Sequence, residues 1–227
     1  RQDPDRRADR QPEFTQLDIE ASFVSEEDVM TLMEQLVQTL FSEVINLQLP
    51  EHFERMPYKE AMRRFGSDKP DLRIPLEIVD IADLCQTLEF AVLKGPALDP
   101  NGRVAALKLP HAEALTRKQL DGYVEFVKGY GAKGLSYLRI QDLEKGREGI
   151  QSSLLKFLPD EILQKLLSRL NAQNGDLIFI ASDTAHIVNT SLGALRVKLG
   201  ADLNLYTKPW AILWVTEFPM FEWADNG

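Results

Sequence analysis

The sequence predicts an α+β protein in which a compact α+β module is inserted between two strand-bearing segments. Residues 13–24 alternate between apolar and polar side chains with period two, which is typical of a half-buried antiparallel strand. After about residue 75, short strands and helices alternate until a long apolar run at 206–223. A strand near each end with a separate unit between them indicates an inserted domain. We therefore expect domain segments at 1–74, 75–205 and 206–227.

The first segment carries clear helix signals after its strand. Ser25, followed by three acidic residues, is a near capping box, and the acids favour the positive end of the helix dipole. Apolar residues at helical spacing then predict a helix over 26–47. A second helix, at 57–65, is predicted to end at Gly66, because glycine is common just after a helix.

The module after residue 75 shows the pattern of a mixed fold. Strands are predicted at 89–94, 103–109, 135–140 and 176–181, and helices at 79–87, 117–130, 159–171 and 183–199. Thr116 and the stretch Ser182–Thr184 precede two of these helices as N-cap signals, and Pro159 suits a helix start. The glycine-rich stretch 129–134 is interpreted as a turn, since it lacks the strand–helix context of a dinucleotide site.

Composition excludes several classes of protein. The chain has one cysteine, Cys85, which rules out a disulfide framework or a cysteine-rich zinc site and indicates a reducing compartment. The Cys85 side chain is expected to be buried in the core. His52, His111 and His186 are scattered without ligand spacing, so we predict no metal site. The stretch Ser182–Thr184 is interpreted as an N-cap signal and not as a nucleophile. No apolar run approaches the ~20 residues of a membrane span. The chain is expected to be soluble and cytoplasmic.

The net charge of −9 restricts how the chain could bind nucleic acid. A field of that sign repels RNA, so RNA contacts must come from a local basic or aromatic surface. Arg1, Arg6, Arg7 and Arg10 form one basic stretch, although the acids among them leave it only weakly positive. This stretch is either a self-paired solvated loop or a clamp for phosphate, which the planar arginine fork suits.

A row of polar side chains along the first predicted strand is the main candidate site. In a strand, Gln16, Asp18 and Glu20 project from one face at intervals of about 7 Å. Two carboxylates at that distance repel each other, so the row makes sense if a cation or an ammonium group neutralises it. The alternative is a strand face that is simply wetted by solvent.

These residues also carry a family resemblance. The stretch from Ala8 to Glu20 resembles the second half of motif 2 in bacterial-type aspartyl-tRNA synthetases, which are class II synthetases, and Arg10-Gln-Pro-Glu-Phe-Thr-Gln-Leu-Asp18 is highly specific to them. Two further strings match in the same order: Gly66-Ser-Asp-Lys-Pro-Asp-Leu-Arg73 and Val215-Thr-Glu-Phe-Pro-Met-Phe-Glu222. Between them, about 75–205 resembles a module shared with some tRNA-dependent amidotransferase subunits, and Ser191-Leu-Gly-Ala-Leu-Arg-Val-Lys-Leu-Gly200 is typical of its end.

The resemblance implies an aspartate–tRNA ligase with the antiparallel-sheet catalytic domain of class II enzymes. ATP with Mg²⁺ would activate L-aspartate to aspartyl-adenylate, and the aspartyl group would pass to the 3′ end of tRNA. Gln16 and Asp18 match residues that face the bound aspartate, with Asp18 near its ammonium group. Glu20 is assigned to the same site because it lies on the same face of the predicted strand. That assignment agrees with a carboxylate row waiting for a cation.

The loop before the strand is assigned to ATP and tRNA by the same resemblance. Gln11 matches a glutamine that contacts ATP, and Arg7 and Arg10 match the loop that meets the tRNA acceptor end. The family's α-phosphate arginine corresponds to Arg1 if one residue is inserted, and to Gln2 without that insertion.

The chain is expected to be a segment of a longer protein. Asn226-Gly227 is a hairpin signal that follows an apolar run, and no returning strand comes after it; two frayed tails are the alternative. Other motifs of the family are absent, so the segment alone is expected to be inactive, whereas the full-length parent would be a homodimeric ligase. The other functional hypothesis is a non-catalytic, amidotransferase-like accessory or interaction module.

Overall fold

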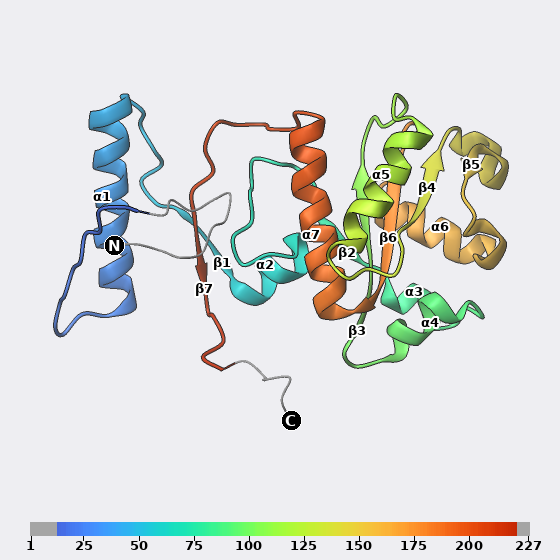
Figure 1. Cartoon of the computed structure of the whole chain (residues 1–227), viewed down its shortest axis with the longest axis horizontal. Helices are drawn as coiled ribbons and strands as arrows, with labels where there is room; N and C mark the ends of the chain where they lie inside the picture. The colour runs from blue at the N-terminus through green and yellow to red at the C-terminus, as the bar shows by residue number, and fades with distance from the viewer. Residues whose placement is uncertain (1–12, 222–227) are drawn as a thin grey trace. The chain divides into compact units, whose positions relative to one another are not determined.

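The structure, a computed structural model, describes residues 13–221 (Figure 1). The described residues form two compact units, one up to Phe53 and one from Glu54. The first unit contains α1 (Glu26–Ile45). The elements of the second unit are, in order, β1 (Glu54–Pro57), α2 (Tyr58–Phe65), β2 (Ile78–Asp80), α3 (Ala82–Cys85), α4 (Ala91–Leu98), β3 (Gly102–Leu109), α5 (Arg117–Lys128), β4 (Ser136–Ile140), β5 (Ile150–Gln151), α6 (Asp160–Arg169), β6 (Leu177–Thr184), α7 (Ala185–Asp202) and β7 (Leu213–Thr216), with short 3₁₀ turns at Leu143–Gly149 and Leu155–Phe157.

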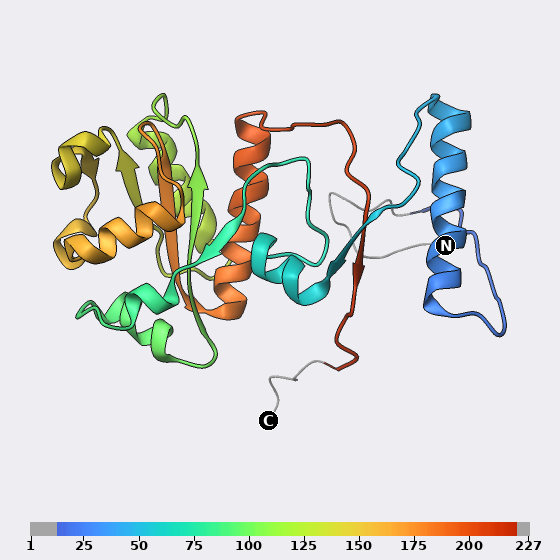
Figure 2. The same cartoon turned by 180° about the vertical axis from the view of Figure 1, so that it is seen from behind.

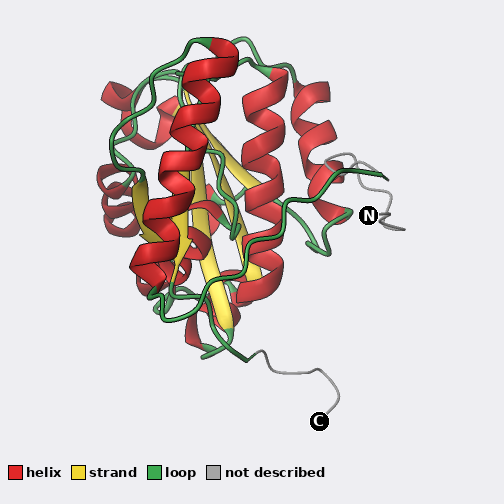
Figure 3. Ribbon diagram, turned by 90° about the vertical axis from the view of Figure 1, so that its left-hand side faces the viewer, coloured by secondary structure: helices red, strands yellow, loops and turns green. Residues whose placement is uncertain are grey.

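A five-stranded antiparallel sheet organises the second unit. Its strand order is β2-β3-β6-β4-β5, and every neighbouring pair is antiparallel. The longest pairing joins β3 and β6, from Gly102 opposite Thr184 to Leu109 opposite Leu177. Figure 3 separates these strands, in yellow, from the helices around them. The predicted α+β class with an antiparallel sheet is confirmed.

Each face of this sheet is buried by its own set of helices. Successive strand residues point to opposite faces, so Leu107 and Phe179 join one core with α5 and α7. Ala106 and Ile178 join a second core, on the other face, with α3, α4 and α6. Figures 1 and 2 show the two sets of helices from opposite sides. Because both faces are covered, β3 and β6 are nearly continuous apolar runs.

The segments that flank the five-stranded sheet meet in a second, smaller sheet. β1 and β7 pair in parallel, with Glu54 opposite Leu213 and Pro57 opposite Thr216. A small apolar core lies beside this pair and consists of Met56, Ala61 and Phe65, with Leu72, Leu213 and Val215 packed against them. The chain therefore returns to β1 after the five-stranded sheet is complete. The domain boundaries at 74 and 205 stay a prediction.

Helix ends follow the local signals in the sequence. The Ser25 hydroxyl accepts a bond from the Asp28 N–H, and the Asp28 carboxylate accepts one from the Ser25 N–H at 2.8 Å, which completes the capping box of α1. Thr116 and Gln119 form the same box at α5. Gly66 ends α2 with φ of 66°, a left-handed conformation that glycine adopts without steric cost. These predicted helices are confirmed, although α1 ends at Ile45 and exposes much of its apolar face.

Several predicted strands and helices are wrong or differ in extent. The structure has no strand over 14–24. Residues 89–94 are not a strand, and α4 occupies most of this stretch. The predicted helix at 79–87 divides into β2 and α3, and within the described part of the run 206–223 only β7 is a strand.

Two further findings concern the single cysteine and the apolar character of the helices. Cys85 is buried, as predicted, and burial raises the pKa of its thiol to about 11, so the thiol stays protonated at neutral pH. Among residues 13–221, no helix has both the length and the apolar character that crossing a membrane requires.

Candidate functional site

The predicted aspartate site lies on the surface of the first unit. Gln16, Asp18 and Glu20 are all exposed, in an extended segment that follows an isolated bridge at Glu13. The Gln16 amide donates a hydrogen bond to the Asp18 carboxylate, so these two side chains lie together. The three side chains line neither of the two cavities described below. The binding of aspartate by these three side chains stays a prediction.

The residues predicted to contact ATP and tRNA are not among those that the structure describes. Arg1, Arg7, Arg10 and Gln11 lie outside the described residues. Of the three family strings, the one at 66–73 lies wholly within the described part, and the one at 215–222 lies there except for its last residue. These two strings, and the string Ser191–Gly200, therefore lie in the second unit.

The string at 66–73 packs against α7. Gly66 and Gly193 let the backbone of the loop and the backbone of the helix approach closely. A Cβ added at Gly193 would lie 2.8 Å from the Gly66 carbonyl oxygen and 2.9 Å from that of Phe65. A Cβ added at Gly66 would lie 2.2 Å from the Asn189 carbonyl oxygen. Close packing between the loop that begins at Gly66 and helix α7 therefore requires glycine at both positions.

Arg196, on the same helix, holds the loop from within. It is 1 % exposed, and its guanidinium donates to the backbone carbonyls of Asp71 at 2.7 Å, Ile74 at 2.6 Å and Leu76 at 2.6 Å. Its Cζ also lies 4.7 Å from the centre of the Phe65 ring, a cation–π contact. Burial lowers the pKa of Arg196 to about 10, which leaves it charged at neutral pH. A charged group in that position orders the loop by satisfying its carbonyls.

Arg73 joins the loop to the segment that leads back to β7. Its guanidinium binds the Asp71 carboxylate at 2.8 and 2.7 Å and holds the pKa of that carboxyl below its usual range. It also lies over the Tyr206 ring, 4.9 Å from its centre. The Arg73 carbonyl accepts bonds from the Thr207 N–H at 2.9 Å and from its hydroxyl at 3.1 Å. The backbone just before β2 is therefore tied to the backbone that follows α7.

A cavity of about 680 Å³ opens between α2, the first turns of α7 and the residues that follow β7. It is lined by Tyr58, Lys59, Met62, Arg63, Arg103, Ala185, His186, Asn189, Glu217 and Pro219. Glu217 has φ of 57°, which is uncommon for a residue with a side chain and costs on the order of 1–3 kcal/mol. The Tyr58 and Phe218 rings lie 4.9 Å apart beside it. Lys59 and Arg63 can bind an anionic group here, while Glu217 can accept a hydrogen bond.

Sequence reasoning missed this cavity. Lys59 and His186 are more than a hundred residues apart, and their order in the chain gives no sign that they share a wall. In the sequence, His186 is an isolated histidine without ligand spacing. Among the described residues, no three His, Cys, Asp or Glu side chains lie close enough together to hold a metal ion.

The close packing at Gly193 makes a testable prediction. Gly193→Ala should lower the free energy of unfolding by about 1–3 kcal/mol, because the new methyl group meets backbone oxygens that cannot move aside cheaply. Gly95→Ala is the matched control: it lies in α4 with no atom within 4 Å of an added Cβ, and it should gain up to about 1 kcal/mol. Urea unfolding of both variants measures the difference. Equal effects of the two substitutions would contradict the assigned role of Gly193.

Comparison with known families matches nearly the whole chain to one of them. The family model described as tRNA synthetases class II (D, K and N) matches residues 2–225. The match therefore extends over both units and over all the strings discussed above.

Proposed function

Because this chain belongs to the class II tRNA synthetases of the D, K and N group, we propose that it is part of an aspartate–tRNA ligase. Aminoacyl-tRNA ligase activity follows from the family, whose partners are ATP, an amino acid and tRNA. Aspartate is the finer assignment. It rests on the string Arg10-Gln-Pro-Glu-Phe-Thr-Gln-Leu-Asp18, which resembles the aspartyl enzymes of bacterial type.

The proposed chemistry has two steps, and the chain supplies positioning and charge in both. An oxygen of the aspartate carboxylate attacks the α-phosphorus of ATP, and pyrophosphate leaves. A hydroxyl of the terminal ribose of tRNA then attacks the carbonyl carbon of the adenylate, and AMP leaves. Mg²⁺ enters with ATP as part of that substrate. No covalent intermediate on a side chain is needed.

The row of polar groups would hold the amino acid during the first step. Asp18 offers a carboxylate to the ammonium group of aspartate, while Gln16 and Glu20 flank it. The exposure of all three side chains leaves them accessible to a ligand. The hydrogen bond from Gln16 supports this role, because it orients the Asp18 carboxylate.

The loop that precedes the row would bind the other substrates. Gln11 and Arg1 are proposed to contact ATP, with Gln2 as the alternative to Arg1. Arg7 and Arg10 are proposed to contact the unpaired acceptor end of tRNA, which is the kind of RNA that proteins read most readily. We also propose a cytoplasmic homodimer for the full-length enzyme.

The amino acid that the enzyme activates tests this assignment. In ATP–pyrophosphate exchange by the full-length protein, L-aspartate should support a rate at least about 100-fold above that of L-asparagine or L-lysine. Preference for asparagine or lysine would overturn the aspartate assignment and keep the family. Exchange with none of the three would favour a non-catalytic accessory module.

A further inference from the structure

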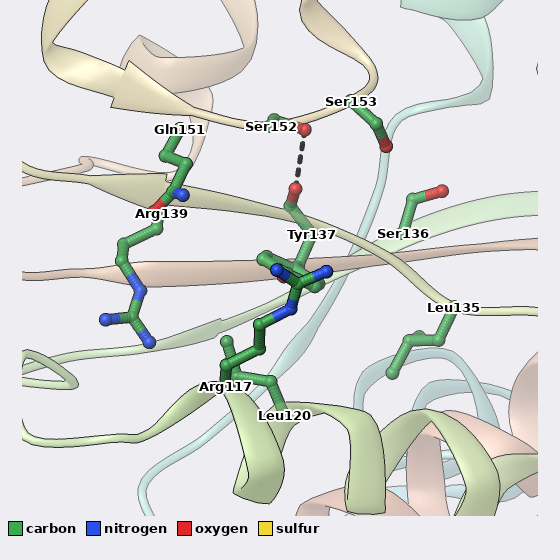
Figure 4. Close-up of a pocket in the computed structure, with 9 residues that line it drawn as sticks. All are labelled: Arg117, Leu120, Leu135, Ser136, Tyr137, Arg139, Gln151, Ser152 and Ser153. Atoms are coloured by element: carbon green, nitrogen blue, oxygen red, sulfur yellow. Dashed lines mark hydrogen bonds between the residues drawn. The ribbon is translucent and has the colours of Figure 1, made fainter.

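A second cavity lies within the five-stranded-sheet unit, between α5 and the β4–β5 edge (Figure 4). Its volume is about 470 Å³. The lining side chains are Arg117, Leu120, Leu135, Ser136, Tyr137, Arg139, Gln151, Ser152 and Ser153. We call it the Arg117–Arg139 pocket. None of the residues proposed above for aspartate, ATP or tRNA belongs to it.

The charge in this pocket has one sign. Arg117 projects from the first turn of α5, and Arg139 projects from β4 into the same space (Figure 4). No carboxylate is among the lining residues. Two cations around one cavity repel each other, and a bound anion would remove that repulsion.

The two arginines differ in how many of their donors are used. Arg139 donates to the Leu115 carbonyl at 2.6 Å, which fixes its guanidinium and leaves other N–H groups for a ligand. In the described part of the chain, Arg117 makes no side-chain hydrogen bond or ion pair. The Arg117 guanidinium therefore lines the cavity without pairing with another described side chain or backbone group.

Hydroxyl groups complete the lining. The Ser152 hydroxyl donates to the Tyr137 carbonyl at 2.6 Å and accepts from the Leu154 N–H at 3.1 Å, so it shapes the β5 edge. Ser136 and Ser153 have no side-chain partner among the described residues, and in Figure 4 the Ser136 hydroxyl lies on the other side of β4 from the Arg117 and Arg139 side chains. An arginine guanidinium supplies only hydrogen-bond donors, and a serine hydroxyl can rotate to donate to an incoming oxygen.

We propose that the Arg117–Arg139 pocket binds a phosphate group. The planar guanidinium matches two phosphate oxygens at once. In a chain of net charge −9, an acid-free pocket with two arginines is a local exception that attracts anions. The phosphate belongs either to an RNA backbone or to a small phosphate compound. Neither source depends on which amino acid the enzyme activates.

Arg117→Ala in the full-length protein tests the proposal. If the phosphate belongs to RNA, the affinity for tRNA should fall about 3- to 10-fold, and the slope of log affinity against log salt should shrink by about one. If it belongs to a small compound, calorimetric titration with inorganic phosphate should detect binding by the unaltered protein that the variant lacks, with tRNA affinity unchanged. Amino-acid-dependent pyrophosphate exchange should stay the same in both cases.

Lys118→Ala is the matched control. Lys118 follows Arg117 on α5, is exposed, and carries the same charge outside the lining of the pocket. Loss of tRNA or phosphate binding in Arg117→Ala but not in Lys118→Ala supports the pocket. Equal losses in the two variants point to a general field effect and overturn it, as does unchanged binding in Arg117→Ala. Because Arg117 makes no side-chain hydrogen bond or ion pair within residues 13–221, both variants should unfold at the same temperature as the unaltered protein.

Discussion

Asp18→Asn in the full-length enzyme is expected to lower kcat/KM for aspartate in pyrophosphate exchange by about 10²- to 10³-fold. The substitution keeps the shape of the side chain and removes the charge that is proposed to face the ammonium group. Loss of one partner of such a pair costs about 3–4 kcal/mol, which corresponds to that factor. Most of the change should appear in KM for aspartate, because the countercharge acts on the bound amino acid before the reaction as well as during it.

The control for this experiment is a carboxylate elsewhere in the first unit. Glu43→Gln removes one exposed negative charge from α1 and should leave the kinetics unchanged. Asp18 is itself exposed, and its one described hydrogen bond comes from Gln16, so Asp18→Asn should fold normally. If kcat/KM for aspartate is the same in Asp18→Asn as in the unaltered enzyme, Asp18 does not bind the ammonium group.

Arg196→Ala is expected to destabilise the second unit by about 3–5 kcal/mol. Removal of the guanidinium leaves the carbonyls of Asp71, Ile74 and Leu76 without their buried donor and creates a cavity beside Phe65. Urea unfolding measures this loss. Because Arg196 orders the loop at 66–76, proteolysis of that loop should also become faster.

Lys198→Ala provides the comparison on the same helix. Lys198 pairs with Asp202 at 3.1 Å, but both side chains are more than a third exposed, so its removal should cost no more than about 0.5 kcal/mol. A loss below about 1 kcal/mol for Arg196→Ala would falsify the view that this arginine holds the loop.

The helices with local end signals could be predicted from the sequence. Ser25 and Thr116 form capping boxes with residues only three positions away, and Gly66 ends α2 through its own backbone conformation. Such interactions are complete within one turn, so the sequence around them contains all the partners. The limits of α1 and α5 accordingly lie within two residues of the predicted ones.

The strands predicted at 103–109, 135–140 and 176–181 are confirmed as β3, β4 and β6, whereas those at 13–24 and 89–94 are wrong. Residues 89–94 are an apolar run that suits a buried strand or a buried helix, and α4 places Leu93 and Ala97, one helical turn apart, in the core. Residues 13–24 have the period of a strand, but the structure has no strand over 14–24, since alternation shows which faces of a strand would be apolar and polar and not whether the segment pairs.

The sequence by itself determined the family, the α+β class and the residues proposed for aspartate, because short strings and local spacing carry that information. Only the tertiary structure decided which distant residues meet. Arg196 binds carbonyls 120 to 125 residues away, and Arg117 shares a pocket with Arg139 from another element. No local pattern encodes such contacts, since they exist only after the sheet has paired and the helices have packed on its two faces.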